Sequence, residues 1–234
     1  MIKWKGHNWL QQERWGSVHP DKPNWWYDPS ASFIDTEERL NLITQKNPRY
    51  FEEIKKTSTI GVGLVSCETK FKWGEFQIEA KLPYGKNLWP AFWMWSFDSW
   101  PPEIDVFEGY SDDNPNYFKF RLGKPFGFWN LQTNVHYTKN GVSKMMGGKT
   151  HYFGFKDPTK EFIKYSVIWE PKSLRFYYNE RLVREVKDPN ILSQLNSTTM
   201  NVIINNGVTS DVDINNPPSS NFIIKDFVYK PINI

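Results

Sequence analysis

The sequence contains little cysteine and histidine, and this shortage limits the kinds of site it can build. Its one cysteine, Cys67, has no partner for a disulfide within the chain and leaves no cysteine-based zinc site. The four histidines include no pair at the spacing of metal ligands. A chain of 234 residues can bury a sizeable core without such cross-links. We therefore expect a single domain over residues 1–234, a monomer, with no metal ion in its active site.

Long hydrophobic runs and a strong net charge are missing as well. The longest apolar run, Leu88 to Trp95, is far shorter than the roughly 20 residues that a membrane-spanning helix needs. The formal net charge of +3 gives no indication of a nucleic-acid partner, although it would tolerate an anionic polymer. The first residues lead directly into polar sequence, without the apolar segment of a signal peptide. We expect neither a membrane span nor nucleic-acid binding.

Aromatic residues, in contrast, are abundant. Phe, Trp and Tyr make up 17% of the chain, with 12 tryptophans, while the mean hydropathy stays at −0.63. Such side chains are favoured in the core of a β-rich protein. They also offer flat faces on which sugar rings can stack. Both uses can hold in one molecule.

Alternation of polar and apolar residues predicts an all-β fold. Between Glu75 and Leu82 every second residue is apolar, the period of a strand with one buried face. Two short helices are expected, at Asn47–Lys56 and at Asp188–Leu195, the second with Pro189 at its first position. Many short strands at regular spacing favour a β-jelly-roll sandwich of two antiparallel sheets. The further expected strands are Ser32–Ile34, Leu40–Ile43, Gly61–Cys67, Leu88–Ser96, Ile104–Glu108, Thr133–Tyr137, Phe162–Trp169, Leu174–Tyr178, Leu182–Lys187, Met200–Asn205 and Phe222–Lys230.

Three acidic residues are crowded into one expected strand. In a regular strand Glu103 and Asp105 share a face and Glu108 points the other way. One inserted residue, a β-bulge at Val106-Phe107, would bring all three carboxyls to the same face. Like charges so close together are costly to ionise, and chemistry that uses differently protonated carboxyls would account for them. A solvated edge strand and a calcium site remain open as alternatives, although the acids lack the loop that calcium sites usually use.

The six residues Glu103 to Glu108 resemble the active-site signature of glycoside hydrolase family 16, in the bulged form found in laminarinases, agarases, carrageenases and porphyranases. The resemblance implies a jelly roll whose concave sheet forms a cleft along a polysaccharide, the expected partner. Other segments resemble the family in its own order along the chain: Lys72–Pro83, Leu88–Met94, Tyr165–Pro171, Leu174–Tyr178 and Ile223–Tyr229.

The resemblance also implies a retaining mechanism with named roles. Glu103 would attack the anomeric carbon and form a glycosyl-enzyme. Glu108 would protonate the leaving oxygen and then activate water. Retaining carboxyls lie roughly 5–5.5 Å apart, which a bulged strand can supply. Asp105, between them, would hydrogen-bond the nucleophile and help set the protonation of the trio.

Four further residues are candidate substrate contacts. His136 resembles a histidine beside the catalytic strand, with a buried structural histidine as the alternative. Trp100 precedes the acidic segment, where family members often stack a sugar. By alternation, Trp89 shares a face with Ala91, Trp93 and Trp95, and we expect Trp89 and Trp100 to be sugar platforms. Asn205 corresponds to an asparagine of the concave face.

The chain also departs from the family pattern. Its N-terminus lacks the usual acidic opening, so the family's structural calcium is doubtful, although Asp226 could serve as one ligand; we expect no other cofactor. Residues from Asn114 to Leu131 form an unusual insertion, either a specificity loop or an ordinary surface insertion. A polysaccharidase would act in an extracellular or periplasmic location.

The substrate is the least determined feature. We predict an endo-acting enzyme on β-1,3-glucan, with β-galactans as the alternative because the insertion is basic. A non-catalytic sugar-binding jelly roll would be marked by loss of Glu103 or Glu108, and neither is lost. A transglycosylase on the same site also remains open.

Overall fold

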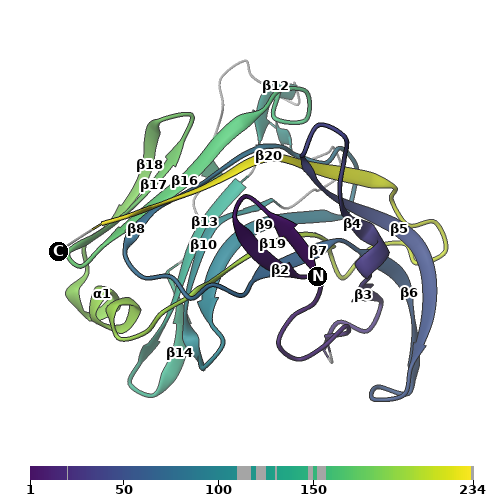
Figure 1. Cartoon of the computed structure of the whole chain (residues 1–234), viewed down its shortest axis with the longest axis horizontal. Coiled ribbons are helices and arrows are strands. Elements are labelled where there is room, and N and C mark those ends of the chain that lie inside the picture. The colour runs from purple at the N-terminus through teal and green to yellow at the C-terminus, as the bar shows by residue number, and fades with distance from the viewer. Residues whose placement is uncertain are drawn as a thin grey trace.

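The computed structural model describes residues 1–19, 21–109, 117–119, 125–129, 131–146, 150–151 and 157–232. These residues form two stacked β-sheets (Figure 1). The first, which we call the cleft sheet, has the order β1 (Ile2–Trp4), β2 (His7–Leu10), β7 (Leu64–Cys67), β19 (Asn201–Val208), β9 (Leu88–Ser96), β10 (Ser99–Gly109), β13 (Leu131–Lys139) and β14 (Val142–Met145), with β15 (Thr150–His151) also pairing with β13.

The second sheet, which we call the outer sheet, covers one face of the cleft sheet. Its order is β18 (Arg181–Val186), β17 (Ser173–Tyr178), β16 (Ile163–Glu170), β8 (Gly74–Lys81), β20 (Ser220–Pro231), β5 (Leu40–Phe51), β6 (Lys56–Val62) and β3 (Trp25–Tyr27), with β4 (Ser32–Ile34) pairing with β5. The predicted all-β jelly-roll sandwich is therefore confirmed. One pair, β3 with β6, is parallel rather than antiparallel.

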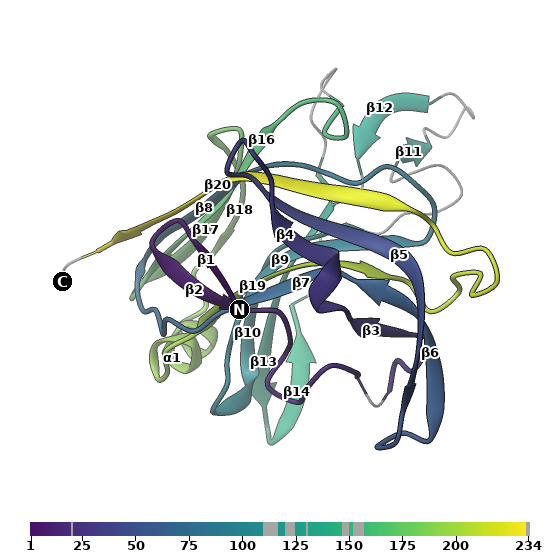
Figure 2. The ribbon, with the colours of Figure 1, turned by 45° about the vertical axis from the view of Figure 1, so that its right-hand side comes forward.

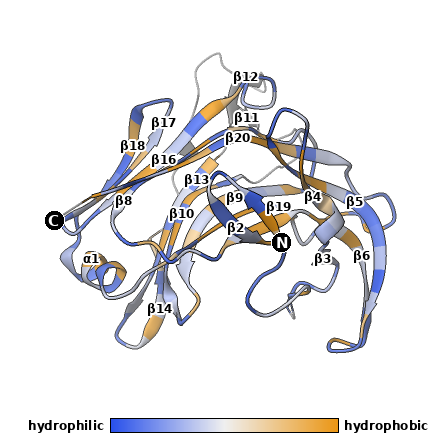
Figure 3. Cartoon of the chain, viewed as in Figure 1, coloured by the Kyte–Doolittle hydropathy of each residue, from blue (hydrophilic) through white to orange (hydrophobic). Residues whose placement is uncertain are grey.

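The space between the sheets is filled by the apolar face of each strand. In β8 buried and half-buried residues alternate without exception, and Phe76, Ile78 and Ala80 are completely buried. Hydrophobic and hydrophilic residues alternate in the same way along several other strands (Figure 3). Because a strand alternates its side chains between faces, this pattern sends one set into the core and the other to the cleft or the solvent.

Helical structure is limited to two short elements in the described residues. The helix α1 (Pro189–Asn196) begins as predicted, with the Asp188 carboxylate accepting a hydrogen bond from the Asn190 amide at 2.8 Å; a 3-10 turn spans Pro29–Ala31. The helix expected at Asn47–Lys56 is wrong, because these residues end β5, turn, and begin β6. The pairing of β5 with β6 across a register shift satisfies their backbone instead. No helix here is both long and apolar enough to cross a bilayer.

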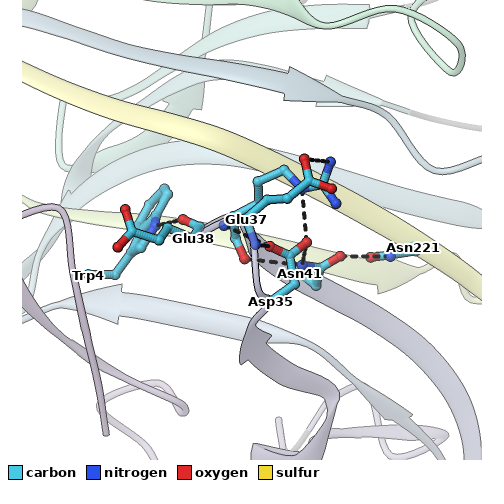
Figure 4. Close-up of polar contacts among 7 residues, drawn as sticks. Trp4, Asp35, Glu37, Glu38, Asn41 and Asn221 are labelled. Atoms are coloured by element: carbon cyan, nitrogen blue, oxygen red, sulfur yellow. Dashed lines mark hydrogen bonds and ion pairs between the residues drawn. The ribbon is translucent and has the colours of Figure 1, made fainter.

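A polar turn joins the outer sheet to the N-terminal strands (Figure 4). Asp35 accepts hydrogen bonds from the backbone of Glu37 and Arg39 at 2.9 and 3.0 Å, and from the Asn41 side chain at 3.0 Å. The carbonyl of Glu38, in the same turn, accepts from the Trp4 indole at 2.9 Å. This turn therefore fixes the N-terminal strands against β4 and β5.

Half of the insertion predicted at Asn114–Leu131 lies outside the described residues. Within it, β11 (Tyr117–Lys119) and β12 (Pro125–Trp129) pair as a separate two-stranded antiparallel sheet (Figure 2). Its proposed role in specificity stays a prediction.

Candidate active site

The acidic segment lies in β10, near the middle of the cleft sheet, and it contains the predicted bulge. Against β9, Asp105 pairs with Trp93 and Phe107 with Phe92, so Val106 is the extra residue. Against β13 the register shifts over the same stretch, between Asp105 and Glu108. A bulge of this kind reverses the facing of every residue that follows it.

The bulge places apolar and acidic side chains on opposite faces of β10. Val106 and Phe107 are both fully buried in the core between the sheets. Glu103, Asp105 and Glu108 all line one cavity on the opposite face of β10. A regular strand would have sent Glu108 into the core, so one extra residue assembles the carboxylate trio.

Two side chains from neighbouring positions contact Glu103. The Trp100 indole N–H donates a hydrogen bond to Glu103 Oε2 at 2.8 Å. The Nε2 atom of His136 lies 3.5 Å from Glu103 Oε1 and 3.4 Å from Asp105 Oδ2. The predicted residues Trp100 and His136 therefore belong to the same cluster as the nucleophile candidate, with Trp100 and His136 rings 5.7 Å apart.

Glu108 is held from both neighbouring strands. The Trp89 indole N–H on β9 donates to Glu108 Oε1 at 3.2 Å. The Asn134 amide on β13 donates to Glu108 Oε2 at 3.1 Å. Glu108 is only 9% exposed, so these donors orient it at the edge of the cavity.

Burial and crowding determine the electrostatics of the trio. Burial raises the pKa of the Glu103 carboxyl well above its usual range, and the charge of Asp105 adds to this, while His136 and Trp100 oppose it. Burial also raises the pKa of Asp105, which is 2% exposed, well above its usual range, and the charge of Glu108 adds to it. Two neighbouring buried carboxyls with raised pKa values share a proton most easily, because ionising both is costly.

The cavity above the trio has a volume of about 460 Å³. Its floor is built by β9, β10 and β19, and by alternation Trp89, Ala91, Trp93 and Trp95 all face into it. Asn205 on β19 joins the floor, since its side chain accepts from the Trp93 indole at 2.8 Å and donates to the Trp89 carbonyl at 3.2 Å. All seven predicted site residues therefore lie at or beside one cleft.

One wall of the cavity is an N-terminal segment that we call the strap, residues 13–19 and 21–27. Six of its side chains line the cavity: Trp15, His19, Asp21, Lys22, Trp25 and Tyr27. The Arg14 guanidinium packs on the Trp95 ring at 4.6 Å and donates to the Phe97 carbonyl. The Lys22 ammonium lies 4.0 Å from the centre of the Trp89 ring. The strap thus covers aromatic faces of the floor, including the predicted platform Trp89.

A buried carboxyl lies at the base of the strap. Glu13 is 1% exposed, and its Oε2 accepts a hydrogen bond from the Arg14 amide at 3.3 Å. Burial raises its pKa to about 8, and the nearby charge of Glu103 adds to the shift. The strap therefore brings a neutral acid close to the carboxylate trio at neutral pH.

The possible calcium ligand Asp226 already has a cationic partner. Its Oδ1 lies 3.1 Å from the Lys5 ammonium and also accepts the Phe227 amide at 3.0 Å. A divalent ion at Asp226 would have to displace this ammonium group. The absence of a structural calcium stays a prediction.

Several residues of the site were not predicted from the sequence. Asn134 could have been, because it stands two positions before His136 on the same strand and so shares its face. The tryptophans of the N-terminal thirty residues were expected from the sequence to cover the sandwich or to line a cleft, and Trp15 and Trp25 do line the cavity. The other strap residues carried no such signal. Their positions depend on contacts far along the chain, such as Arg14 with Phe97.

Comparison with known proteins agrees with this geometry. The family model described as Glycosyl hydrolases family 16 matches residues 21–219. The catalytic domain of an endo-1,3-beta-glucanase (laminarinase) from Thermotoga petrophila RKU-1 has a similar fold, with a TM-score of 0.71 and 20% identity over 90% of this chain and 84% of that one.

Two curated relatives are much longer than this chain. Endo-1,3-1,4-beta-glycanase EglC of Rhizobium meliloti is 23% identical over 80% of this chain and 38% of its own length. Keratan-sulfate endo-1,4-beta-galactosidase of Sphingobacterium multivorum is 28% identical over 47% of this chain and 24% of its own. The chain therefore spans less than two fifths of either relative.

Proposed function

Because the chain belongs to glycosyl hydrolases family 16, we propose that it is a retaining endo-β-glycosidase that cleaves a polysaccharide in the cleft. The observation that carries the proposal is the bulge of β10, which brings Glu103, Asp105 and Glu108 to one cavity. Two carboxyls flanking a glycosidic bond are the usual machinery of such hydrolysis.

In the first half-reaction, Glu103 attacks the anomeric carbon and a covalent glycosyl-enzyme forms. Glu103 must be ionised for this step. Asp105 is the more deeply buried of the pair, so we place their shared proton on Asp105, whose O–H donates a hydrogen bond to the ionised Glu103. The Trp100 indole N–H, 2.8 Å from Glu103, stabilises its carboxylate in the same way.

Glu108 acts on the other side of the cleaved bond. It gives its proton to the leaving oxygen and then, as a carboxylate, takes a proton from the water that hydrolyses the intermediate. Hydrogen bonds from Trp89 and Asn134 keep its carboxyl in place through both steps.

For the substrate, we propose β-1,3-glucan. The cavity is lined by several aromatic side chains, Trp93 and the exposed Trp100 among them, which suits a neutral chain of sugar rings. The solved laminarinase that shares this fold supports the same choice. Because a polymer of this kind is met outside the cytoplasm, we place the reaction in an extracellular or periplasmic location.

A β-galactan with anionic groups is the second candidate. The Lys22 ammonium lines the cavity beside Trp89 and could pair with a sulfate on the substrate. The relative that acts on keratan sulfate favours this alternative.

A substrate panel tests the assignment. Purified wild type, Glu103→Gln and Glu108→Gln are incubated with laminarin, agarose, porphyran and carrageenan, and the products are sized. We expect laminarin to be shortened by wild type and by a control variant, but by neither Glu103→Gln nor Glu108→Gln. The control is Glu75→Gln, the same change at a carboxylate of the outer sheet that pairs with Lys230 at 2.9 Å.

Each outcome has a clear meaning. Equal activity in all four proteins would refute the role of the trio. Cleavage of a sulfated galactan in preference to laminarin would establish the second candidate. Longer products would indicate transglycosylation. Proton NMR of the first product decides the stereochemistry, and an inverted anomer would contradict the retaining mechanism.

A further inference from the structure

The bulge of β10 is contacted from behind by the outer sheet. The Tyr178 hydroxyl, on β17, donates a hydrogen bond to the Val106 carbonyl at 2.9 Å. Val106 is the extra residue of the bulge, and Tyr178 is 3% exposed. An extra residue disrupts the ladder of strand hydrogen bonds, so a buried carbonyl there needs another donor. Tyr178 supplies it across the core.

A second donor from the outer sheet reaches the strand beside the bulge. Arg184, on β18, donates from Nη1 to the Thr133 carbonyl at 2.6 Å and to the Thr133 hydroxyl at 3.1 Å. Its Nη2 donates to the Met146 carbonyl at 2.6 Å. Thr133 lies opposite the bulge, because the residues on either side of it pair with Glu108 and Asp105.

We propose that Tyr178 and Arg184 are positioning residues that fix the separation of Glu103 and Glu108. The two glutamates lie on opposite sides of the bulge, so any change of its backbone alters the distance between their carboxyls. Tyr178 restrains the bulged strand and Arg184 restrains its partner. This inference rests on the proposed function, since that function gives the separation its importance.

Arg184 also places a positive charge beneath the trio. Asp105 faces Glu103 and Glu108 on its own strand and His136 on β13, and Arg184 acts on it from the outer sheet. Arg184 is 7% exposed, and its three hydrogen-bond acceptors are neutral oxygens, so its positive charge stays available to act on Asp105. This charge opposes the rise in the pKa of Asp105 that burial causes.

The hydroxyl of Tyr178 can be tested against a matched control. Tyr178→Phe removes one hydroxyl-to-carbonyl hydrogen bond at the bulge. Tyr229→Phe removes a comparable bond, to the Lys72 carbonyl at 2.9 Å, away from β10. We expect both variants to lose similar thermal stability. Only Tyr178→Phe should lose kcat, about tenfold, with KM within about twofold of wild type. Equal kcat values in the two variants would overturn the proposal for Tyr178.

Arg184 needs a measurement that does not depend on substrate. Arg184→Lys keeps the charge, whereas Arg184→Met removes it, and carboxyl ¹³C NMR follows the titration of the trio. We expect the pKa of Asp105 to rise in Arg184→Met and to stay near the wild-type value in Arg184→Lys, with kcat lowered in both. An unchanged titration together with an unchanged kcat would overturn the proposal. A wild type that cleaves no substrate would refute the proposed function alone, because the titration remains readable.

Discussion

The floor of the cleft and its wall are built in opposite ways. The floor consists of long paired strands, in which register decides which side chain faces the cavity. The wall is the strap, which contributes only the three-residue β3 to a sheet and is otherwise held by irregular backbone hydrogen bonds and by the ring contacts of Arg14 and Lys22. A carboxyl in the floor is therefore placed by the backbone, whereas an aromatic ring in the wall is placed by its partners.

The difference separates the residues that cleave the glycosidic bond from the residues that recognise the sugar chain. Bond cleavage tolerates little error in the positions of its acids, and a sheet provides that rigidity. Recognition of a sugar chain tolerates more, and loops can vary without disturbing the sheet. The predictions below change one region and ask whether the other responds.

Inserting one alanine between Phe107 and Glu108 should have the largest effect. With the bulge kept, the added residue would turn Glu108 from the cleft to the core. We expect activity to fall by about 1,000-fold or more, because general acid catalysis would be lost. Val106→Ala, which keeps the bulge and adds no residue, should retain most of the activity. An insertion variant that folds, by circular dichroism, and still cleaves substrate would contradict this account of the floor.

Glu13 should make stability depend on pH. Its pKa rises from 4.5 in the unfolded chain to about 8 in the folded protein, so the folded state holds the proton more tightly. The contribution of Glu13 to the free energy of unfolding should then fall as pH rises from about 4.5 to about 8, by on the order of 5 kcal/mol at most, and level off above. In Glu13→Gln this contribution should be missing, while the part due to the raised pKa values of Glu103 and Asp105 remains.

Urea denaturation at pH 4.5, 6 and 9 measures that dependence. Glu180→Gln, at an exposed carboxyl, is the control and should behave as wild type. The same slope in wild type and Glu13→Gln would show that Glu13 does not titrate in this range.

Trp15→Ala should weaken binding while leaving the floor intact. The Trp15 ring lies 5.4 Å from the Trp95 ring and lines the cavity. Loss of one aromatic contact should raise KM about tenfold and leave kcat within about twofold. A fall in kcat with unchanged KM would mean that the wall takes part in the chemistry.

Lys22→Met should have the smallest effect on rate and a visible effect on products. Lys22 and Trp89 both line the main cavity and a second one of about 350 Å³, so their contact divides the two. Removing the ammonium group should join them and lengthen the bound stretch of sugar chain. We expect kcat/KM to change less than about fivefold while the product sizes shift. An unchanged product profile would show that the second cavity takes no sugar.

The floor could be predicted from the sequence much better than the wall. Alternation located nearly every long strand, and the crowding of three acids located the bulge, because both are local patterns. The failed helix at Asn47–Lys56 shows the limit, since its residues are ordered by pairing between β5 and β6. The strap, Tyr178 and Arg184 act across the chain or across the core, so no short pattern marks them.

The parallel pairing of β3 with β6 has a consequence for the order of folding. Trp25 pairs with Ile60, so β3, the strand of the wall, finds its partner within about the first quarter of the chain. The floor pairs Ile203 with Ser66, and this contact must wait for nearly the whole sequence. Contacts between distant residues are slow to form. During synthesis on a ribosome, β3 of the wall would therefore have its partner β6 available before the floor is complete. The strand β19, made late, would complete the floor of the cleft.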